Sequence, residues 1–85
     1  MTTVLLFARA AELAGIRTLE IHADDAAEVI ASLDIRFGPE FARVSRSSSI
    51  AVDGEVVSRD DLIGQQATEL AILPPVSGGC IERQR

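Results

Sequence analysis

The sequence predicts a small α+β protein, an α+β roll in which a mixed four- or five-stranded sheet packs on one long helix. Two observations favour this class. Five short segments have the apolar runs, alternation or turn signals of strands, and one longer segment, residues 25–37, has the spacing of an amphipathic helix. Two of the strands precede this helix and three follow it. The 85 residues leave room for one domain.

The first part of the chain predicts two strands separated by a short helix. Residues 3–8 form an apolar run whose brevity favours a central strand. Residues 8–14 are rich in Ala, Glu and Leu, and Gly15 stands where a helix C-cap is expected. Residues 18–22 alternate polar and apolar side chains, which is typical of a half-buried strand.

The long helix has a start signal, an apolar stripe and a stop signal. Asp25 can cap its first turn, and Glu28 follows three residues later as in a capping box. Four apolar residues then share one helical face: Val29, Ile30, Leu33 and Phe37. Gly38 and Pro39 predict its end.

After Pro39 we expect one turn, with Phe41 and Val44 as its apolar contacts, followed by a polar loop at residues 45–49. Residues 49–52 and 55–57 predict two strands. The Asp-Gly pair between them is a strong hairpin signal.

The last elements are a loop and a strand. Residues 59–68 are polar and predict a loop that holds one turn around Leu62 and Ile63. Residues 69–73 predict the final strand. Pro74 and Pro75 end it, because proline cannot donate a hydrogen bond to a neighbouring strand.

Composition excludes several classes of function. The net charge of −5 argues against a nucleic-acid partner and favours a basic protein surface. No segment approaches the ~20 apolar residues that cross a bilayer. Cys80 is the single cysteine and cannot form an internal disulfide, so we expect a cytoplasmic protein without membrane contact. The absence of Lys, Trp and Tyr argues against sites built on an amine, a phenol or aromatic stacking.

Three segments resemble one known family. Residues 73–79 read Leu-Pro-Pro-Val-Ser-Gly-Gly, residues 4–15 look like that family's first strand and helix, and residues 50–54 look like its central hairpin. Together they resemble the MoaD family, the small sulfur-carrier subunit of molybdopterin synthase. The resemblance covers residues 3–79 and implies a ubiquitin-like β-grasp fold.

The resemblance also implies a division of the chain and a chemistry. It divides the chain into a β-grasp domain at residues 1–75, a Gly-Gly arm at residues 76–79 and an extension at residues 80–85. In the family, an activating enzyme uses ATP to adenylate the terminal glycine carboxylate, which becomes a thiocarboxylate and gives sulfur to a pterin precursor in the large subunit. Gly79 matches that glycine. The protein would bind no cofactor or metal and would have no independent active site.

The same resemblance implies which residues meet the partners. Those of the arm and its base are Leu73, Pro74, Pro75, Val76, Ser77 and Gly78. Phe7 and Val56 would join Leu73 in an exposed patch on the sheet, shared by the large subunit and the activating enzyme. Burial of these three side chains in the core is the alternative.

The extension departs from the family, whose members usually end at the second glycine. Because Cys80 follows Gly79, that glycine has no free carboxylate. We therefore hypothesise a precursor that a protease cuts between the two residues. A harmless extension is the alternative, since exposed termini tolerate additions. Cys80 is either incidental or a thiol that takes part in acyl or sulfur transfer.

Other functions and sites stay open. Carriers for thiamine or cysteine synthesis, ubiquitin-like protein modifiers and pure interaction modules are alternatives. A lone histidine, His22, is expected to face solvent rather than bind a metal. The aspartate pairs at residues 24–25 and 60–61 favour capping and turn roles over a cation site. Arg43 and Arg46 favour a solvated surface over an anion-binding site.

Overall fold

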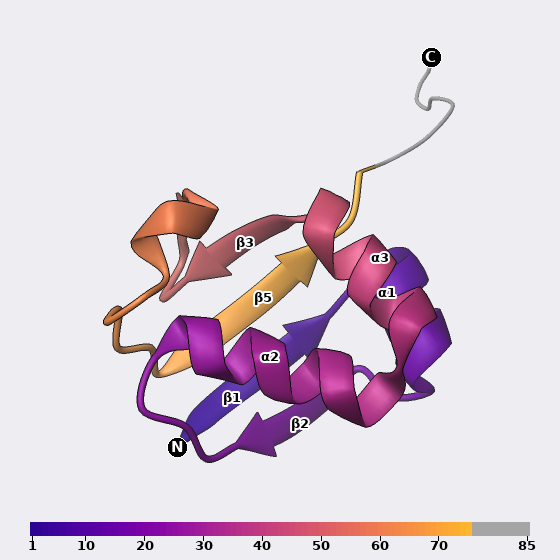
Figure 1. Cartoon of the computed structure of the whole chain (residues 1–85), viewed down its shortest axis with the longest axis horizontal. Helices are drawn as coiled ribbons and strands as arrows, with labels where there is room; N and C mark the ends of the chain where they lie inside the picture. The colour runs from indigo at the N-terminus through magenta and orange to yellow at the C-terminus, as the bar shows by residue number, and fades with distance from the viewer. Residues whose placement is uncertain (76–85) are drawn as a thin grey trace.

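The computed structural model describes residues 1–75, and residues 76–85 lie outside that description. Strands and helices are interspersed along the chain (Figure 1). In chain order they are β1 (Thr2–Leu6), α1 (Ala8–Ala14), β2 (Thr18–Ile21), α2 (Ala26–Phe37), α3 (Pro39–Ser47), β3 (Ser49–Val52), β4 (Glu55–Val57), the 3-10 helix η1 (Arg59–Asp61) and β5 (Glu69–Leu73).

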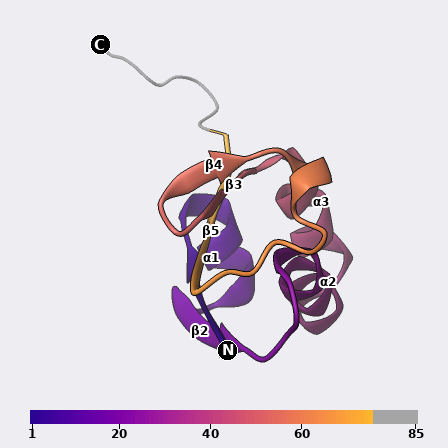
Figure 2. The same ribbon diagram turned by 90° about the vertical axis from the view of Figure 1, so that its left-hand side faces the viewer.

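The five strands form one mixed sheet in the order β2-β1-β5-β3-β4. Only the central pair, β1 and β5, is parallel, with Leu6 opposite Ile72. The other three pairs are antiparallel. Figure 2 shows the sheet on one side of the molecule and α2 and α3 on the other. The α+β class and the five-stranded form of the predicted sheet are confirmed.

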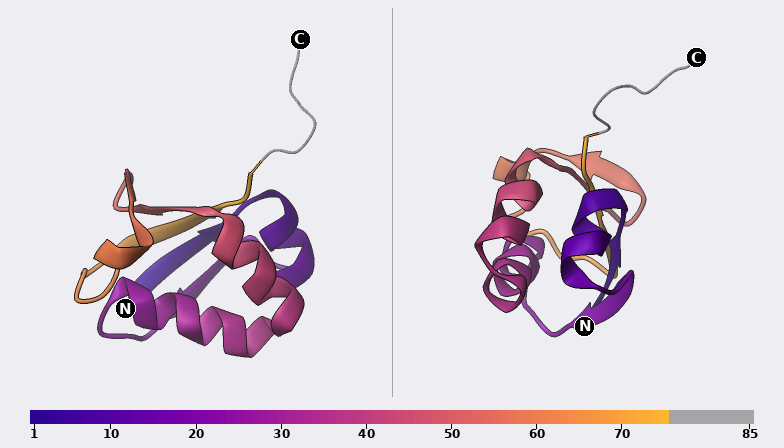
Figure 3. Two further views of the ribbon diagram at one scale, coloured as in Figure 1. Left: turned by 45° about the horizontal axis from the view of Figure 1, so that its top comes forward. Right: turned by 90° about the vertical axis from the view of Figure 1, so that its right-hand side faces the viewer.

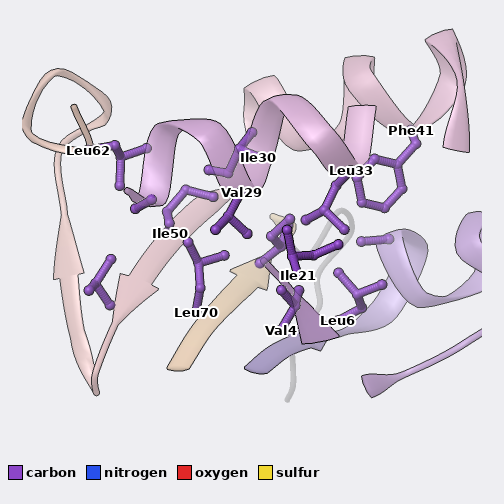
Figure 4. Close-up of a cluster of buried hydrophobic side chains, with 14 residues drawn as sticks. Val4, Leu6, Ile21, Val29, Ile30, Leu33, Phe41, Ile50, Leu62 and Leu70 are labelled. Atoms are coloured by element: carbon purple, nitrogen blue, oxygen red, sulfur yellow. The ribbon is translucent and has the colours of Figure 1, made fainter. Parts of the chain in front are cut away.

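The core lies between the sheet and these helices. Alternate strand residues, among them Val4 and Leu70, point toward α2 (Figure 4). Val4, Leu70 and Ile72 are fully buried. Leu33 of α2 and Phe41 of α3 meet them and are also fully buried. Complete burial of one such side chain is worth ~1.5–3 kcal/mol relative to exposure, so this layer contact stabilises the fold.

Both predicted boundaries of α2 are confirmed. The Asp25 carboxylate accepts a hydrogen bond from the Glu28 backbone N–H at 2.9 Å, and the Glu28 carboxylate accepts one from the Asp24 N–H at 2.9 Å. The box therefore closes one residue earlier than expected. Gly38 ends the helix with φ of +96°, a conformation that an L side chain rarely adopts, and Pro39 opens α3.

The expected polar loop at residues 45–49 is wrong for most of its length, because α3 continues to Ser47. Ser45 lies four residues after Phe41 on the same helical face and is fully buried. The Arg59 guanidinium donates to its backbone oxygen. The Ser47 and Ser48 hydroxyls donate to the Val44 carbonyl oxygen at 3.1 and 2.6 Å. These bonds satisfy polar groups of the last turn, so a serine-rich sequence is tolerated there.

Two aspartates fix the remaining turns. Asp53 and Gly54 have φ of +51° and +91°, as the predicted hairpin requires. The Asp53 carboxylate accepts hydrogen bonds from the backbone N–H groups of Thr68 and Glu69 at 3.0 and 2.8 Å. Asp25 accepts another from the Gly64 N–H at 2.8 Å. The hairpin is thereby tied to the start of β5, and the loop after η1 to the start of α2 (Figure 3).

No helix within the described residues is both long enough and apolar enough to cross a membrane.

Candidate functional site

The outward face of the sheet, opposite α2, carries a row of small and apolar side chains. Strand pairing places Leu5 opposite Ala71, Ala71 opposite Ala51, and Ala51 opposite Val56. On β1, β5 and β3 the strand neighbours of these residues are buried core residues, so Leu5, Ala71 and Ala51 face away from the core. Val56 lies opposite Ala51 and so shares their face. Val56, at the end of the row, is 68% exposed. We call this set the outward row.

Phe7 and Leu73 lie beyond the outward row at the end of β1 and β5. Because Leu6 is opposite Ile72 in the parallel pair, the next residue of each strand reaches the same level. Phe7 keeps an extended backbone, continues the alternation of β1 and is 46% exposed. Leu73 is half-buried and lies opposite Ser49. Phe7, Val56 and Leu73 thus share one face, and none belongs to the buried core.

The C-terminal arm begins at this same end of the sheet. Pro74 is half-buried and Pro75 is exposed, immediately after β5. The remaining predicted arm residues, Val76, Ser77, Gly78 and Gly79, lie outside the described residues, as does the extension at 80–85. Phe7 and Leu73 therefore lie beside the point where the chain leaves the sheet. Figure 1 shows this end of β5.

A shallow pocket borders the face and was not predicted from the sequence. It lies between α1 and the start of β2, and its lining includes Phe7, Ala11, Glu12, Ile16 and Arg17. Ile16 is 43% exposed. Its position in a turn, outside any apolar stripe, gave no signal of this contact.

The other candidate sites have structural roles or stand in solvent. His22 is exposed. Backbone hydrogen bonds from Glu28 and then Gly64 hold the pKa of Asp25 below its usual value, as expected of a cap. Asp60 and Asp61 lie in η1. Within residues 1–75, no group of three or more His, Cys, Asp or Glu side chains is placed to hold a metal ion.

The buried carboxyl group of Asp34 is a second feature, after the shallow pocket, that was not predicted from the sequence. Its Oδ1 atom is buried without a hydrogen-bond partner in the described structure. Desolvation raises the pKa of this carboxyl group, and a hydrogen bond with Ser45 and the charges of Arg59 and Arg46 offset part of the rise. The group lies between α2 and α3, away from the outward face of the sheet.

Comparison with known proteins agrees with this architecture. Residues 4–79 match the ThiS family. The "Molybdopterin synthase sulfur carrier subunit" of Arabidopsis thaliana is 39% identical over 79 residues, which cover 89% of this chain and 80% of that protein. The protein of the same name from Caenorhabditis briggsae is 32% identical over 79 residues, covering 89% and 94%.

A solved structure shows the same fold. The small archaeal modifier protein 1 of Methanosarcina acetivorans superposes with a TM-score of 0.71 at 28% identity, covering 92% of this chain and 95% of that one. The predicted ubiquitin-like β-grasp is confirmed by this neighbour, and the resemblance to the MoaD family by the curated relatives. The chain belongs to the ThiS family.

Proposed function

We propose that this protein is the sulfur-carrier small subunit of molybdopterin synthase and that Gly79 is its reactive residue. The observation that carries the proposal is that the exposed Phe7 and the half-buried Leu73 lie on the outward face of the sheet where the chain leaves β5, shortly before Gly78 and Gly79 in the sequence. A surface of this kind usually marks a protein interface. Both curated relatives described above are named for the same role.

The proposed chemistry takes place on the carboxylate of Gly79 in the sites of partner enzymes. In the activating enzyme, the carboxylate attacks the α-phosphorus of ATP and pyrophosphate leaves. A donor of sulfide-level sulfur then displaces AMP and leaves a thiocarboxylate. In the large subunit the thiocarboxylate sulfur bonds to the pterin precursor, and water hydrolyses the acyl–sulfur bond, which leaves the sulfur on the pterin and restores the carboxylate. The carrier binds no cofactor of its own, and ATP belongs to the activating enzyme.

The residue types of the arm suit insertion into another protein's site. Gly78 and Gly79 lack a Cβ atom and can enter a narrow channel with backbone angles that other residues avoid. Pro74 and Pro75 restrict the base of the arm, which lowers the entropy lost when it is bound. Val76 and Ser77 complete the segment that the partners would hold.

The chain must be processed before this chemistry can begin. Gly79 is joined to Cys80 by a peptide bond, so its carboxylate is not free. We propose that a protease hydrolyses this bond and releases residues 80–85, with no chemical role for the Cys80 thiol. The setting we propose is the cytoplasm, in keeping with a chain whose lone cysteine cannot form an internal disulfide.

The intact mass of the protein purified from its native host tests the proposal. We expect a chain that has lost residues 80–85 and carries one sulfur in place of one oxygen at Gly79. Deletion of its gene should abolish molybdenum cofactor. An uncut chain in cells that make the cofactor through this protein would refute processing. Loss of thiamine or cysteine synthesis instead would assign the carrier to another sulfur pathway.

A protein modifier is the second candidate, favoured by the likeness to small archaeal modifier protein 1 at 28% identity. In that case Gly79 would form an isopeptide with lysine side chains of target proteins. The chain has no lysine, so it could not build polymers through its own side chains. Peptide mapping that finds Gly79 on target lysines, and no thiocarboxylate, would favour this candidate over the sulfur carrier.

A further inference from the structure

Positive charge is absent from the strands. Within the described residues, the five strands contain three glutamates, Glu20, Glu55 and Glu69, and no Arg, Lys or His. The three α-helices are balanced by comparison. They carry four arginines and four carboxylates: Arg9, Arg36, Arg43, Arg46, Glu12, Glu28, Asp34 and Glu40. The sheet layer is therefore negative, while the helical layer is close to neutral.

Two of the three strand glutamates lie on the outward face. Glu20 and Glu69 both lie opposite Thr3, one on each side of β1, and both are exposed. Across two strand spacings their backbones are about 10 Å apart. Glu55 lies opposite the buried Val52 and so belongs to the other face.

The outward face is polarised along the strands. Glu69 and Leu73 begin and end β5, four residues or about 13 Å apart. The outward row, with Ala71 on β5, lies between them. The face thus runs from a pair of carboxylates, through small and apolar side chains, to Phe7, Leu73 and the start of the arm.

The two carboxylates have no cation within the described structure. The ion pairs among residues 1–75 are Arg9 with Glu12 and Arg43 with Glu40, and both lie on helices. The carboxylates of Glu20 and Glu69 form no ion pair and accept no hydrogen bond in this part of the chain. A partner that covers the apolar row must also cover or border these carboxylates, and a cation opposite them avoids burying an unpaired charge.

We propose that the outward face takes a protein partner whose surface places basic side chains opposite Glu20 and Glu69 and apolar side chains opposite the outward row. The pair then fixes which way the sheet lies on the partner, and so directs the arm toward the partner's active site. This inference rests on the proposed function, because it assigns the surface chemistry of the large subunit of molybdopterin synthase.

The kinetics of association with that large subunit test the inference. The probe is the recombinant large subunit from the organism of this chain, mixed with the full-length chain in stopped-flow experiments at several salt concentrations. The test variant is Glu20→Gln with Glu69→Gln. The matched control is Glu40→Gln with Glu55→Gln, which removes the same charge from exposed positions away from the outward face.

Rim charges mainly change association rates and their salt dependence. We expect the Glu20→Gln/Glu69→Gln variant to associate roughly 3- to 10-fold more slowly at low salt, with a flatter salt dependence. The difference should shrink above ~0.1 M salt, where charges about 10 Å apart are screened. The control variant should associate within about 2-fold of the wild type, and all three proteins should share one melting temperature.

Two outcomes would overturn the inference while leaving the proposed function in place. One is an unchanged association rate in the Glu20→Gln/Glu69→Gln variant. The other is an equal decrease in both variants, which would assign the effect to net charge alone. If neither the full-length wild-type chain nor a chain ending at Gly79 binds the large subunit, the proposed function and the inference are overturned together.

Discussion

At the scale of single residues, Asp25 connects two distant parts of the chain. One carboxylate oxygen accepts from the Glu28 N–H, and the other accepts from the Gly64 N–H, 39 residues away. Hydrogen bonds to the ionised form lower the pKa of Asp25 from its ordinary 3.8. The contact with Glu28 was predictable from spacing. The contact with Gly64 was not, because only the folded chain brings that loop to the helix.

The lowered pKa predicts a pH-dependent stability. The unfolded chain binds a proton at Asp25 more readily than the folded chain does. The contribution is therefore fully present above about pH 4, the ordinary pKa of an aspartate, and is lost as the pH falls through the folded pKa. We expect Asp25→Asn to flatten the loss of unfolding free energy in this range, because the amide does not titrate. Urea unfolding followed by circular dichroism from pH 7 to pH 3 measures it.

Asp24 provides the matched control for that experiment. It is the adjacent, exposed aspartate, and its carboxylate accepts no hydrogen bond within residues 1–75. Asp24→Asn should keep the steeper pH dependence of the wild type. Equal slopes for the wild type and Asp25→Asn would contradict the role assigned to the two backbone hydrogen bonds.

At the scale of elements, the strands and α2 followed from local pattern, while α3 did not. Two local signals predicted α2: the apolar stripe of Val29, Ile30 and Leu33, and the stop at Gly38. In the structure the stripe is buried and the helix ends at Gly38. The serines after Val44 predict a loop by composition. They become helical because Phe41 anchors this face in the core and Arg59, 14 residues beyond Ser45, binds the last turn. The spacing of residues in the sequence does not predict this contact between Arg59 and Ser45.

The candidate site was likewise predictable from the sequence only in part. Phe7 and Leu73 belong to apolar runs, and such runs leave open which side chains face the helix. The registers of β1, β5 and β3 decide this, because they put Leu5, Ala71 and Ala51 in one row opposite the core. A one-residue shift of any strand would exchange its two faces. Strand pairing was also needed to place the carboxylates of Glu20 and Glu69 at the far end of the same face.

The outward row yields a prediction about binding. Val56→Asp puts a charge at the exposed end of the row, where a partner's apolar surface would have to bury it. We expect at least ~10-fold weaker affinity for the large subunit by titration calorimetry, the size of effect typical of an apolar anchor. Because Val56 is 68% exposed, the melting temperature should stay close to that of the wild type.

Ile35→Asp is the control for the outward row. This residue is 85% exposed on α2, away from the sheet, so the same apolar-to-acidic change should leave the affinity unaltered. If Val56→Asp and Ile35→Asp bind equally to the large subunit, the partner docks elsewhere than on the outward face.

At the scale of the whole molecule, the two ends of the domain pair at its centre. β1 and β5 are neighbours in the middle of the sheet, with Thr3 opposite Glu69 although 66 residues separate them. β3 pairs only with β4 and β5, so β5 joins the two halves of the sheet. Such a fold closes only after nearly the whole domain has been made, and its long-range pairing favours slow folding.

This topology predicts where the chain can be shortened. A chain ending at Thr68 lacks β5 and with it Leu70 and Ile72, two fully buried core residues, so it should remain unfolded. A chain ending at Pro75 keeps the five strands and the core cluster found within the described residues. We expect it to melt cooperatively within ~4 °C of the full-length chain, a difference of about 1 kcal/mol or less. Circular dichroism suits the measurement, because the chain has no Trp or Tyr to report by fluorescence.

The chain ending at Pro75 should also fail to accept sulfur, because it lacks Gly79. If it unfolds well below the full-length chain, residues beyond 75 belong to the folded domain, and the division between a domain at 1–75 and an arm at 76–79 would be wrong.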